Sequence, residues 1–118
     1  MTNYRIVLSL VGKDVSVAPA SMSFANIRIR RPGDILELGR RRGQPADDTT
    51  VWIDAHDGVS FDEFVSAIDK VDWVWSSDWD EALTSFCIYE AGAQLELAPT
   101  RESLSILARR QLSLLVSG

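Results

Sequence analysis

Apolar and polar residues alternate in the first segment of the chain, from residue 4 to residue 11. Because successive side chains of a strand point to opposite faces, this alternation predicts a β-strand. One face carries Tyr4, Ile6, Leu8 and Leu10. Val7 and Val11 lie on the other face, and a strand that is apolar on both sides is expected in the centre of a sheet.

A second strand is predicted where Ala25, Ile27 and Ile29 alternate with polar residues. It should turn at Arg31-Pro32-Gly33-Asp34, because proline presets one corner of a turn and glycine permits a positive φ at the next. We expect residues 35–38 to return as the hairpin partner of this strand. Residues 39–45 combine glycines and a proline with Arg40, Arg41 and Arg42, which predicts an exposed basic loop.

A third strand is predicted over residues 50–54, and the clearest helix of the chain follows it. Ser60 and Glu63 have the spacing of a capping box, which satisfies free backbone N–H groups in the first turn of a helix. The apolar stripe of this helix consists of Phe61, Phe64, Val65, Ile68 and Val71. The helix should end near Asp72.

The last third of the chain predicts a strand over residues 86–89, a turn at 91–92, an extended segment over 94–97, a helix that Thr100 opens, and a closing strand over 112–117. The inner side of this second helix is expected to carry Leu104, Leu107, Ala108 and Gln111. Two amphipathic helices cannot cover both faces of such a sheet. The 118 residues therefore predict a single α+β domain, with a mostly antiparallel sheet of five to six strands and two helices packed on one face.

The composition is that of an ordinary soluble domain, with 46% hydrophobic and 25% charged residues. Cys87 is the only cysteine, so no internal disulfide can form, and we expect a buried thiol and a reducing, cytoplasmic location. The apolar segment near the N-terminus is too short to span a membrane. These features favour a cytoplasmic protein with no membrane contact.

The net charge of −5 conceals an uneven distribution. Residues 1–46 carry eight Lys and Arg against three Asp and Glu, whereas residues 47–81 carry eleven Asp and Glu against Lys70 alone. Such an asymmetry concerns partners and association rates rather than fold. Two interpretations stay open: the basic and acidic parts pair within the molecule, or they serve partners.

The segment from Asp72 to Glu81, here called the acidic segment, contains three of the four tryptophans and four carboxylates. Tryptophan is costly to leave in water and a carboxylate is costly to remove from it, so this segment should lie at a boundary. Exposed tryptophans would be anchors for a partner, and the carboxylates would select a cationic one. Alternatively, Trp73 or Trp75 packs under the helix while the carboxylates point into water. Trp79, with acidic neighbours on both sides, is expected to be the most exposed of the three.

Other candidate sites are weaker. The basic loop could bind phosphate or an acidic protein surface, but the overall acidity and the lack of an aromatic residue in the loop disfavour nucleic acid. Asp54 and His56 would share one side of a strand, yet no third metal ligand follows with recognisable spacing. An enzyme that uses the carboxylates around His56 is a third hypothesis, without a catalytic signature to support it.

The order of elements resembles that of the bacterial domain-of-unknown-function 4279 family. The opening strand, the basic turn at Arg31–Asp34 and the closing block carry the resemblance. That block comprises Thr84–Glu90, a glycine turn, Leu95–Pro99, a Leu-rich helix and the strand 112–116. The resemblance implies a bacterial, single-domain α+β protein without catalytic residues. It also implies relatives suspected to be immunity proteins that accompany secreted toxins.

We therefore expect a non-enzymatic, immunity or antitoxin-type protein that neutralises a cationic protein partner, such as a toxin. Its acidic face would combine the Asp62 and Asp69 side of the first helix with the acidic segment. The partner-binding residues would be Asp72, Trp75, Asp78, Trp79, Asp80 and Glu81, with Arg40, Arg41 and Arg42 as a secondary basic contact. The alternative is a small-molecule or carbohydrate-binding module that stacks its ligand on Trp73, Trp75 and Trp79. We expect no cofactor or metal ion, and exposed strand edges would allow a homodimer.

Overall fold

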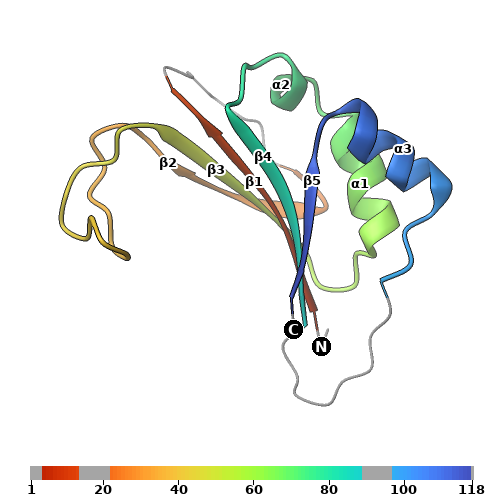
Figure 1. Cartoon of the computed structure of the whole chain (residues 1–118). Helices are drawn as coiled ribbons and strands as arrows, with labels where there is room; N and C mark the ends of the chain where they lie inside the picture. The colour runs from red at the N-terminus through yellow and green to blue at the C-terminus, as the bar shows by residue number, and fades with distance from the viewer. Residues whose placement is uncertain (1–3, 14–21, 89–96, 118) are drawn as a thin grey trace.

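The computed structural model describes residues 4–13, 22–88 and 97–117 and consists of one α+β domain (Figure 1). Its strands are β1 (Tyr4–Gly12), β2 (Ala25–Arg30), β3 (Thr49–Ala55), β4 (Glu81–Ile88) and β5 (Ser113–Ser117). Its helices are α1 (Phe61–Asp69), the short α2 (Asp72–Trp75) and α3 (Arg101–Arg109). No helix in these ranges is long and apolar enough to cross a membrane.

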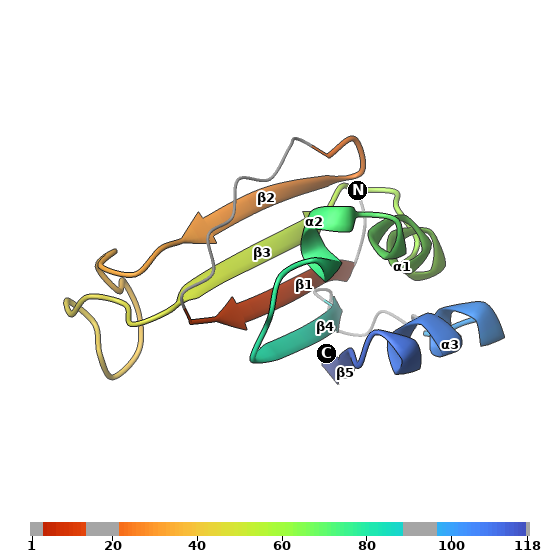
Figure 2. The ribbon, with the colours of Figure 1, turned by 90° about the horizontal axis from the view of Figure 1, so that it is seen from above.

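The five strands form one sheet in the order β2-β3-β1-β4-β5. All neighbours pair antiparallel except β4 and β5, which are parallel. The strands β3, β4 and β5 therefore run in one direction, and the two helical connections between them both advance across the sheet toward β5. Crossovers of one hand then place α1 and α3 on the same face, as Figures 1 and 2 show. The predicted fold class is confirmed.

The core lies between the helices and the apolar face of the sheet. As expected, β1 is the central strand, and Ile6, Leu8 and Leu10 are buried beneath the helices. The fully buried Phe64 and Ile68 of α1 pack onto this face, since they recur at helical spacing. No helix of the described residues covers the opposite face of the sheet, which is here called the open face.

Local signals set the helix boundaries. The Ser60 hydroxyl accepts a hydrogen bond from the Glu63 backbone N–H at 3.2 Å, which confirms the expected cap of α1. Thr100 caps α3 in the same way through the Ser103 N–H, also at 3.2 Å. The turn before the basic loop is also as predicted: the Asp34 N–H donates to the Arg31 carbonyl, and Gly33 has a φ of +93°.

Residues 35–38 are not a strand, contrary to expectation. They bond across to residues 43–46 within the 31–48 connection, and Ile35 and Pro45 form only an isolated bridge. The partner of β2 is β3, which offers a longer apolar register against the core. The 31–48 connection therefore projects beyond the end of the sheet, away from the helices (Figure 2).

The buried face of α3 also differs from the prediction. Ser103, Ile106 and Leu107 are buried, whereas Leu104, Ala108 and Gln111 are exposed. A hydrogen bond between Ser103 and Asp62 of α1 turns this side of the helix inward, so a polar residue occupies a position that apolar spacing alone assigns to Leu104. The expected turn at 91–92, nearly all of the segment 94–97 and the side chain of Cys87 lie outside the described residues.

Candidate functional site

The acidic segment begins with α2 and leads into β4 (Figure 1). Its Val74 is fully buried, and its three tryptophans are partly buried and pack against the hydrophobic core. Trp79, the tryptophan that we most expected to be exposed, is partly buried like the other two. The rings turn inward because the margin of the core between α1 and β4 gives them apolar contacts, which water cannot provide.

Hydrogen bonds and stacking hold two of these indoles in place. The Trp75 Nε1–H donates to the Ile68 carbonyl at 2.9 Å, and the Trp79 Nε1–H donates to the Val74 carbonyl at 2.6 Å. The Arg110 guanidinium lies 4.7 Å from the centre of the Trp75 ring. These two rings are therefore held by the scaffold of the domain.

The carboxylates of the acidic segment point the other way. Asp72, Asp78, Asp80 and Glu81 are all exposed. Asp80 accepts a hydrogen bond from the backbone N–H of Lys13 at 3.2 Å. No ion pair to any of the four side chains occurs in the described part of the chain. The segment thus presents a row of negative charge on a firmly packed base.

Asp62 and Asp69, which we expected to extend this acidic face, instead join α1 to α3. Asp62 accepts hydrogen bonds from the Ser103 hydroxyl at 2.5 Å and the Thr100 N–H at 3.0 Å, which lower its pKa below the ordinary value. Asp69 accepts from Arg110 and Arg109, both at 2.8 Å, and these bonds lower its pKa as well. Asp69 is therefore paired with two arginines within the molecule, and Asp62 holds the beginning of α3 through hydrogen bonds from neutral groups.

The basic and acidic parts of the chain also pair elsewhere. Arg5 and Asp54 form an ion pair at 2.6 Å across neighbouring strands, and Arg41 and Asp47 form another at 2.6 Å. Arg30 lies 4.0 Å from Asp48. Among the described residues, ion pairs therefore engage four of the seven carboxylates of the acidic stretch 47–69, whereas none reaches the four carboxylates of the acidic segment.

The basic loop is exposed as predicted, but its arginines do not act as one group. Arg41 folds back to Asp47 and also donates to the Pro45 carbonyl and the Gln44 side chain. The bond to Asp47 raises the pKa of Arg41 and lowers that of Asp47. Arg40 and Arg42 remain exposed beside it. The basic loop thus keeps two exposed guanidinium groups, those of Arg40 and Arg42, while the hydrogen bonds of Arg41 hold part of the loop in place.

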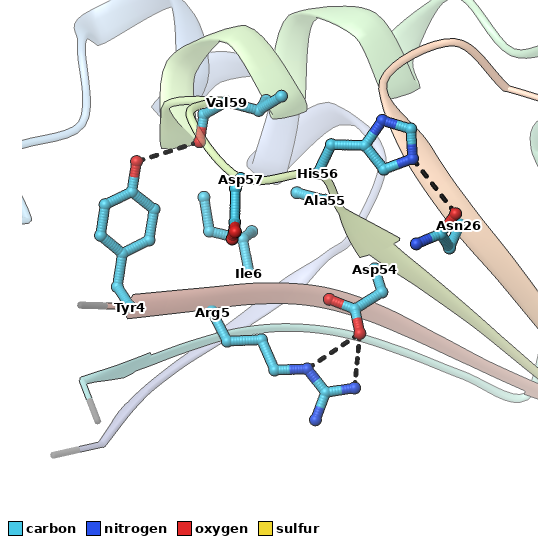
Figure 3. A pocket seen from close by; sticks show the side chains of 9 residues that line it. All are labelled: Tyr4, Arg5, Ile6, Asn26, Asp54, Ala55, His56, Asp57 and Val59. Atoms are coloured by element: carbon cyan, nitrogen blue, oxygen red, sulfur yellow. Dashed lines mark hydrogen bonds and ion pairs between the residues drawn. The ribbon is translucent and has the colours of Figure 1, made fainter. Parts of the chain in front are cut away.

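A hollow of about 430 Å³ lies where β1 begins and β3 ends (Figure 3). Its polar side chains engage one another: Arg5 binds Asp54, the Tyr4 hydroxyl donates to the Val59 carbonyl, and His56 lies 3.2 Å from the Asn26 side-chain oxygen. Asp54 and His56, which the sequence suggested as a pair of metal ligands, thus contact different residues: Asp54 binds Arg5, and His56 lies beside Asn26. Among the described residues no three metal-ligating side chains gather.

Sequence reasoning missed a cluster on the open face. Arg28 and Arg30 of β2 lie over the Trp52 ring of β3, 4.3 and 5.3 Å from its centre. The register pairs Arg28 with Trp52, and these side chains line a second hollow together with Ile35 and Leu38 of the 31–48 connection. The alternation of β2 signalled the arginines, but only the pairing with β3 brings them to Trp52.

No family model, curated protein or solved structure matches the chain in the comparisons with known proteins. The resemblance to the domain-of-unknown-function 4279 family therefore stays a prediction that rests on the sequence pattern.

Proposed function

We propose that this protein is a non-enzymatic binding domain that engages a cationic partner protein through the carboxylates of the acidic segment. The observation that carries the proposal is the division of this segment. Its tryptophan rings pack into the core, while its four carboxylates are exposed without an ion pair within the described residues. Four carboxylates outside the segment, those of Asp47, Asp48, Asp54 and Asp69, form ion pairs within the molecule and so serve the fold.

The packed tryptophans hold the carboxylates of the acidic segment in position for binding. The hydrogen bonds of Trp75 and Trp79 to backbone carbonyls hold the segment before a partner arrives, so less conformational entropy is lost on binding. Exposed charges mainly raise the association rate and select a partner of opposite charge. Because the rings face inward, the tryptophans act as supports and the carboxylates make the contact.

The partner class follows from this charge. Proteins that act on nucleic acids carry basic clefts, and a row of carboxylates offers such a cleft an alternative polyanion. Together with the resemblance stated above, this supports an immunity-type role in a bacterial cytoplasm, in which the domain neutralises a basic toxin. Arg40 and Arg42 would then contact the acidic margin of the same partner.

The test is capture of proteins from native cell extract on the immobilised domain at low and high salt. We expect a basic protein to be retained at low salt and released at high salt, because screening weakens exposed charge pairs. The variant Asp78→Asn/Glu81→Gln should weaken this binding about tenfold. Both side chains are exposed and neither forms a hydrogen bond within the described residues, so the fold should not change.

Glu37→Gln/Glu102→Gln is the matched control, since it removes the same charge from two exposed residues outside the acidic segment. It should bind as the unmodified protein does. Equal weakening by both double variants would indicate a general effect of net charge. Equal retention of the partner by the Asp78 and Glu81 variant would refute the role of the acidic segment.

A further inference from the structure

The hollow on the open face is lined by residues of β2, β3 and the 31–48 connection. Its volume of about 530 Å³ is in the usual range of sites for small molecules. The strands contribute Arg28, Arg30 and Trp52, and the connection contributes Ile35 and Leu38. None of these residues belongs to the acidic segment, so this hollow is separate from the surface proposed above for a partner protein.

Arg28 is positioned by Trp52 but has no acceptor for its N–H groups. Its guanidinium carbon lies over the Trp52 ring, 4.3 Å from the ring centre. A guanidinium can stack on a ring through its flat face, which leaves the N–H groups in its plane free to bind an anion. Arg28 is exposed, and its guanidinium forms no hydrogen bond or ion pair with another described residue. Such a group can bind a carboxylate or a phosphate by two parallel hydrogen bonds.

Arg30 adds a second positive charge at the same ring. Its guanidinium carbon lies 5.3 Å from the centre of the Trp52 ring, and one of its N–H groups donates to the Thr50 hydroxyl at 3.1 Å. Its Nε–H is buried without a hydrogen-bond partner in the described part of the chain. Asp48, at 4.0 Å, compensates this charge only in part, because the attraction between charges weakens with distance. The two guanidinium groups therefore make one side of the hollow positive.

Two carboxylates, those of Asp34 and Glu37, also line the hollow. Asp34 accepts a hydrogen bond from the backbone N–H of Arg31 at 2.7 Å, and neither carboxylate forms an ion pair with the two arginines of β2. A ligand with one anionic group can place this group on the arginines and an uncharged part toward the connection. A chain of many phosphates would be repelled by the two carboxylates, which disfavours nucleic acid.

We infer that this hollow binds a small organic molecule in which one anionic group, a carboxylate or a phosphate, is joined to an apolar body. Arg28 binds the anionic group through its free N–H groups, and the charge of Arg30 strengthens the attraction. The apolar body contacts Ile35 and Leu38, which are 60% and 86% exposed. Removal of this apolar surface from water favours binding.

The test is a titration followed by the indole N–H signals in nuclear magnetic resonance spectra. The chain has four tryptophans, and Trp52→Phe identifies the signal of Trp52. Benzoate and phenyl phosphate are the probes, since each joins one anionic group to an aromatic ring. We expect one or both to shift the Trp52 signal at millimolar concentration and to leave the signals of Trp75 and Trp79 unchanged. The tighter of the two identifies the preferred anionic group.

Two further compounds separate the contributions of charge and apolar surface. Benzyl alcohol lacks the charge and inorganic phosphate lacks the apolar body, so each should bind at least about tenfold more weakly than the better probe. Equal affinity for benzyl alcohol would overturn the role of the arginines. Equal affinity for inorganic phosphate would overturn the role of the apolar body.

Arg28→Gln removes the charge but keeps a long polar side chain, and it should raise the dissociation constant of the better probe at least about tenfold. Arg101→Gln is the matched control, because it removes the same charge from an exposed arginine of α3, on the other face of the sheet. It should bind the probe as the unmodified protein does. So should Asp78→Asn/Glu81→Gln, which keeps this test independent of the test for a partner protein. A Trp52 signal that neither anion shifts, or unchanged affinity in Arg28→Gln, would overturn the inference.

Discussion

The four tryptophans show how a residue's partners decide its role. Trp75 and Trp79 use their indole N–H groups to bind backbone carbonyls, and their rings cover the margin of the core. Trp73 packs against the same core but has no indole hydrogen bond to a described residue. Trp52 lies instead on the open face beneath two arginines. Tryptophan thus has three roles in this protein: it donates a hydrogen bond to the backbone, it packs on the core, or it offers its ring to guanidinium groups.

Trp79→Phe should lower the free energy of unfolding more than Trp73→Phe. Both variants remove the same atoms from a partly buried ring, but only the first leaves the Val74 carbonyl without its donor. We expect the difference to be about 1–2 kcal/mol, the usual effect of an unsatisfied acceptor. Urea unfolding followed by circular dichroism measures it. Equal losses would mean that the 2.6 Å hydrogen bond adds nothing to stability.

At the scale of elements, α3 is held by polar contacts at its two ends. Thr100 and Ser103 bind Asp62 at its beginning, and Arg109 and Arg110 bind Asp69 at its end. Because Asp62 and Asp69 lie two turns apart on α1, the two helices are aligned along their length. This alignment sets the rotation of α3 and explains why Leu104 faces outward although its spacing matches an apolar stripe.

Thr100→Ala should destabilise the protein by about 1 kcal/mol, since it removes the N-cap of α3 and one bond to Asp62. Thr100→Ser is the control, because it keeps the hydroxyl and should lose much less. Thermal unfolding of both variants measures the effect. Should the two variants melt at the same temperature, the cap contributes nothing and the bonds of Ser103 and Asp69 alone hold the helix.

For the whole molecule, ion pairs between the basic and acidic parts of the chain reduce its charge asymmetry without removing it. Arg5, Arg30 and Arg41 approach Asp54, Asp48 and Asp47, and Asp69 binds the arginines of α3. The acidic segment keeps four exposed carboxylates without an ion pair in the described residues, and it leads into β4.

Stability should fall in acid because the pKa values of Asp62 and Asp69 are lowered in the folded state. The unfolded chain then binds protons at a higher pH than the folded chain does. Their stabilisation is complete above the ordinary carboxyl pKa of about 3.9 and is lost as the pH falls through the lower folded values. Urea unfolding at pH 7 and near pH 3 should show this loss.

Asp62→Asn/Asp69→Asn should be less stable at pH 7 and should lose less on acidification. Asp72→Asn/Asp78→Asn removes two exposed carboxylates that form no ion pair within the described residues, and it should keep the full acid dependence. An unchanged acid dependence in the first variant would assign the effect to other carboxylates.

The sequence by itself determined the features that depend on neighbours along the chain. Strand alternation identified β1 as central, and the spacing of Ser60 and Glu63 located the cap of α1. The basic turn at Pro32 and Gly33 was also predictable, because φ preferences are local. These signals were sufficient for the α+β class and for the exposure of the carboxylates in the acidic segment.

Only the tertiary structure decided which of these groups are available. Asp62 meets Ser103 across 41 residues of sequence, and Arg5 meets Asp54 across 49. No local pattern encodes such pairs, so the sequence could not show that Asp62 and Asp69 are used internally. It could not show that Trp79 faces the core or that α3 turns Leu104 outward. The physical reason is that long-range packing chooses among faces that local periodicity leaves equivalent, and burial then determines which charges remain for a partner.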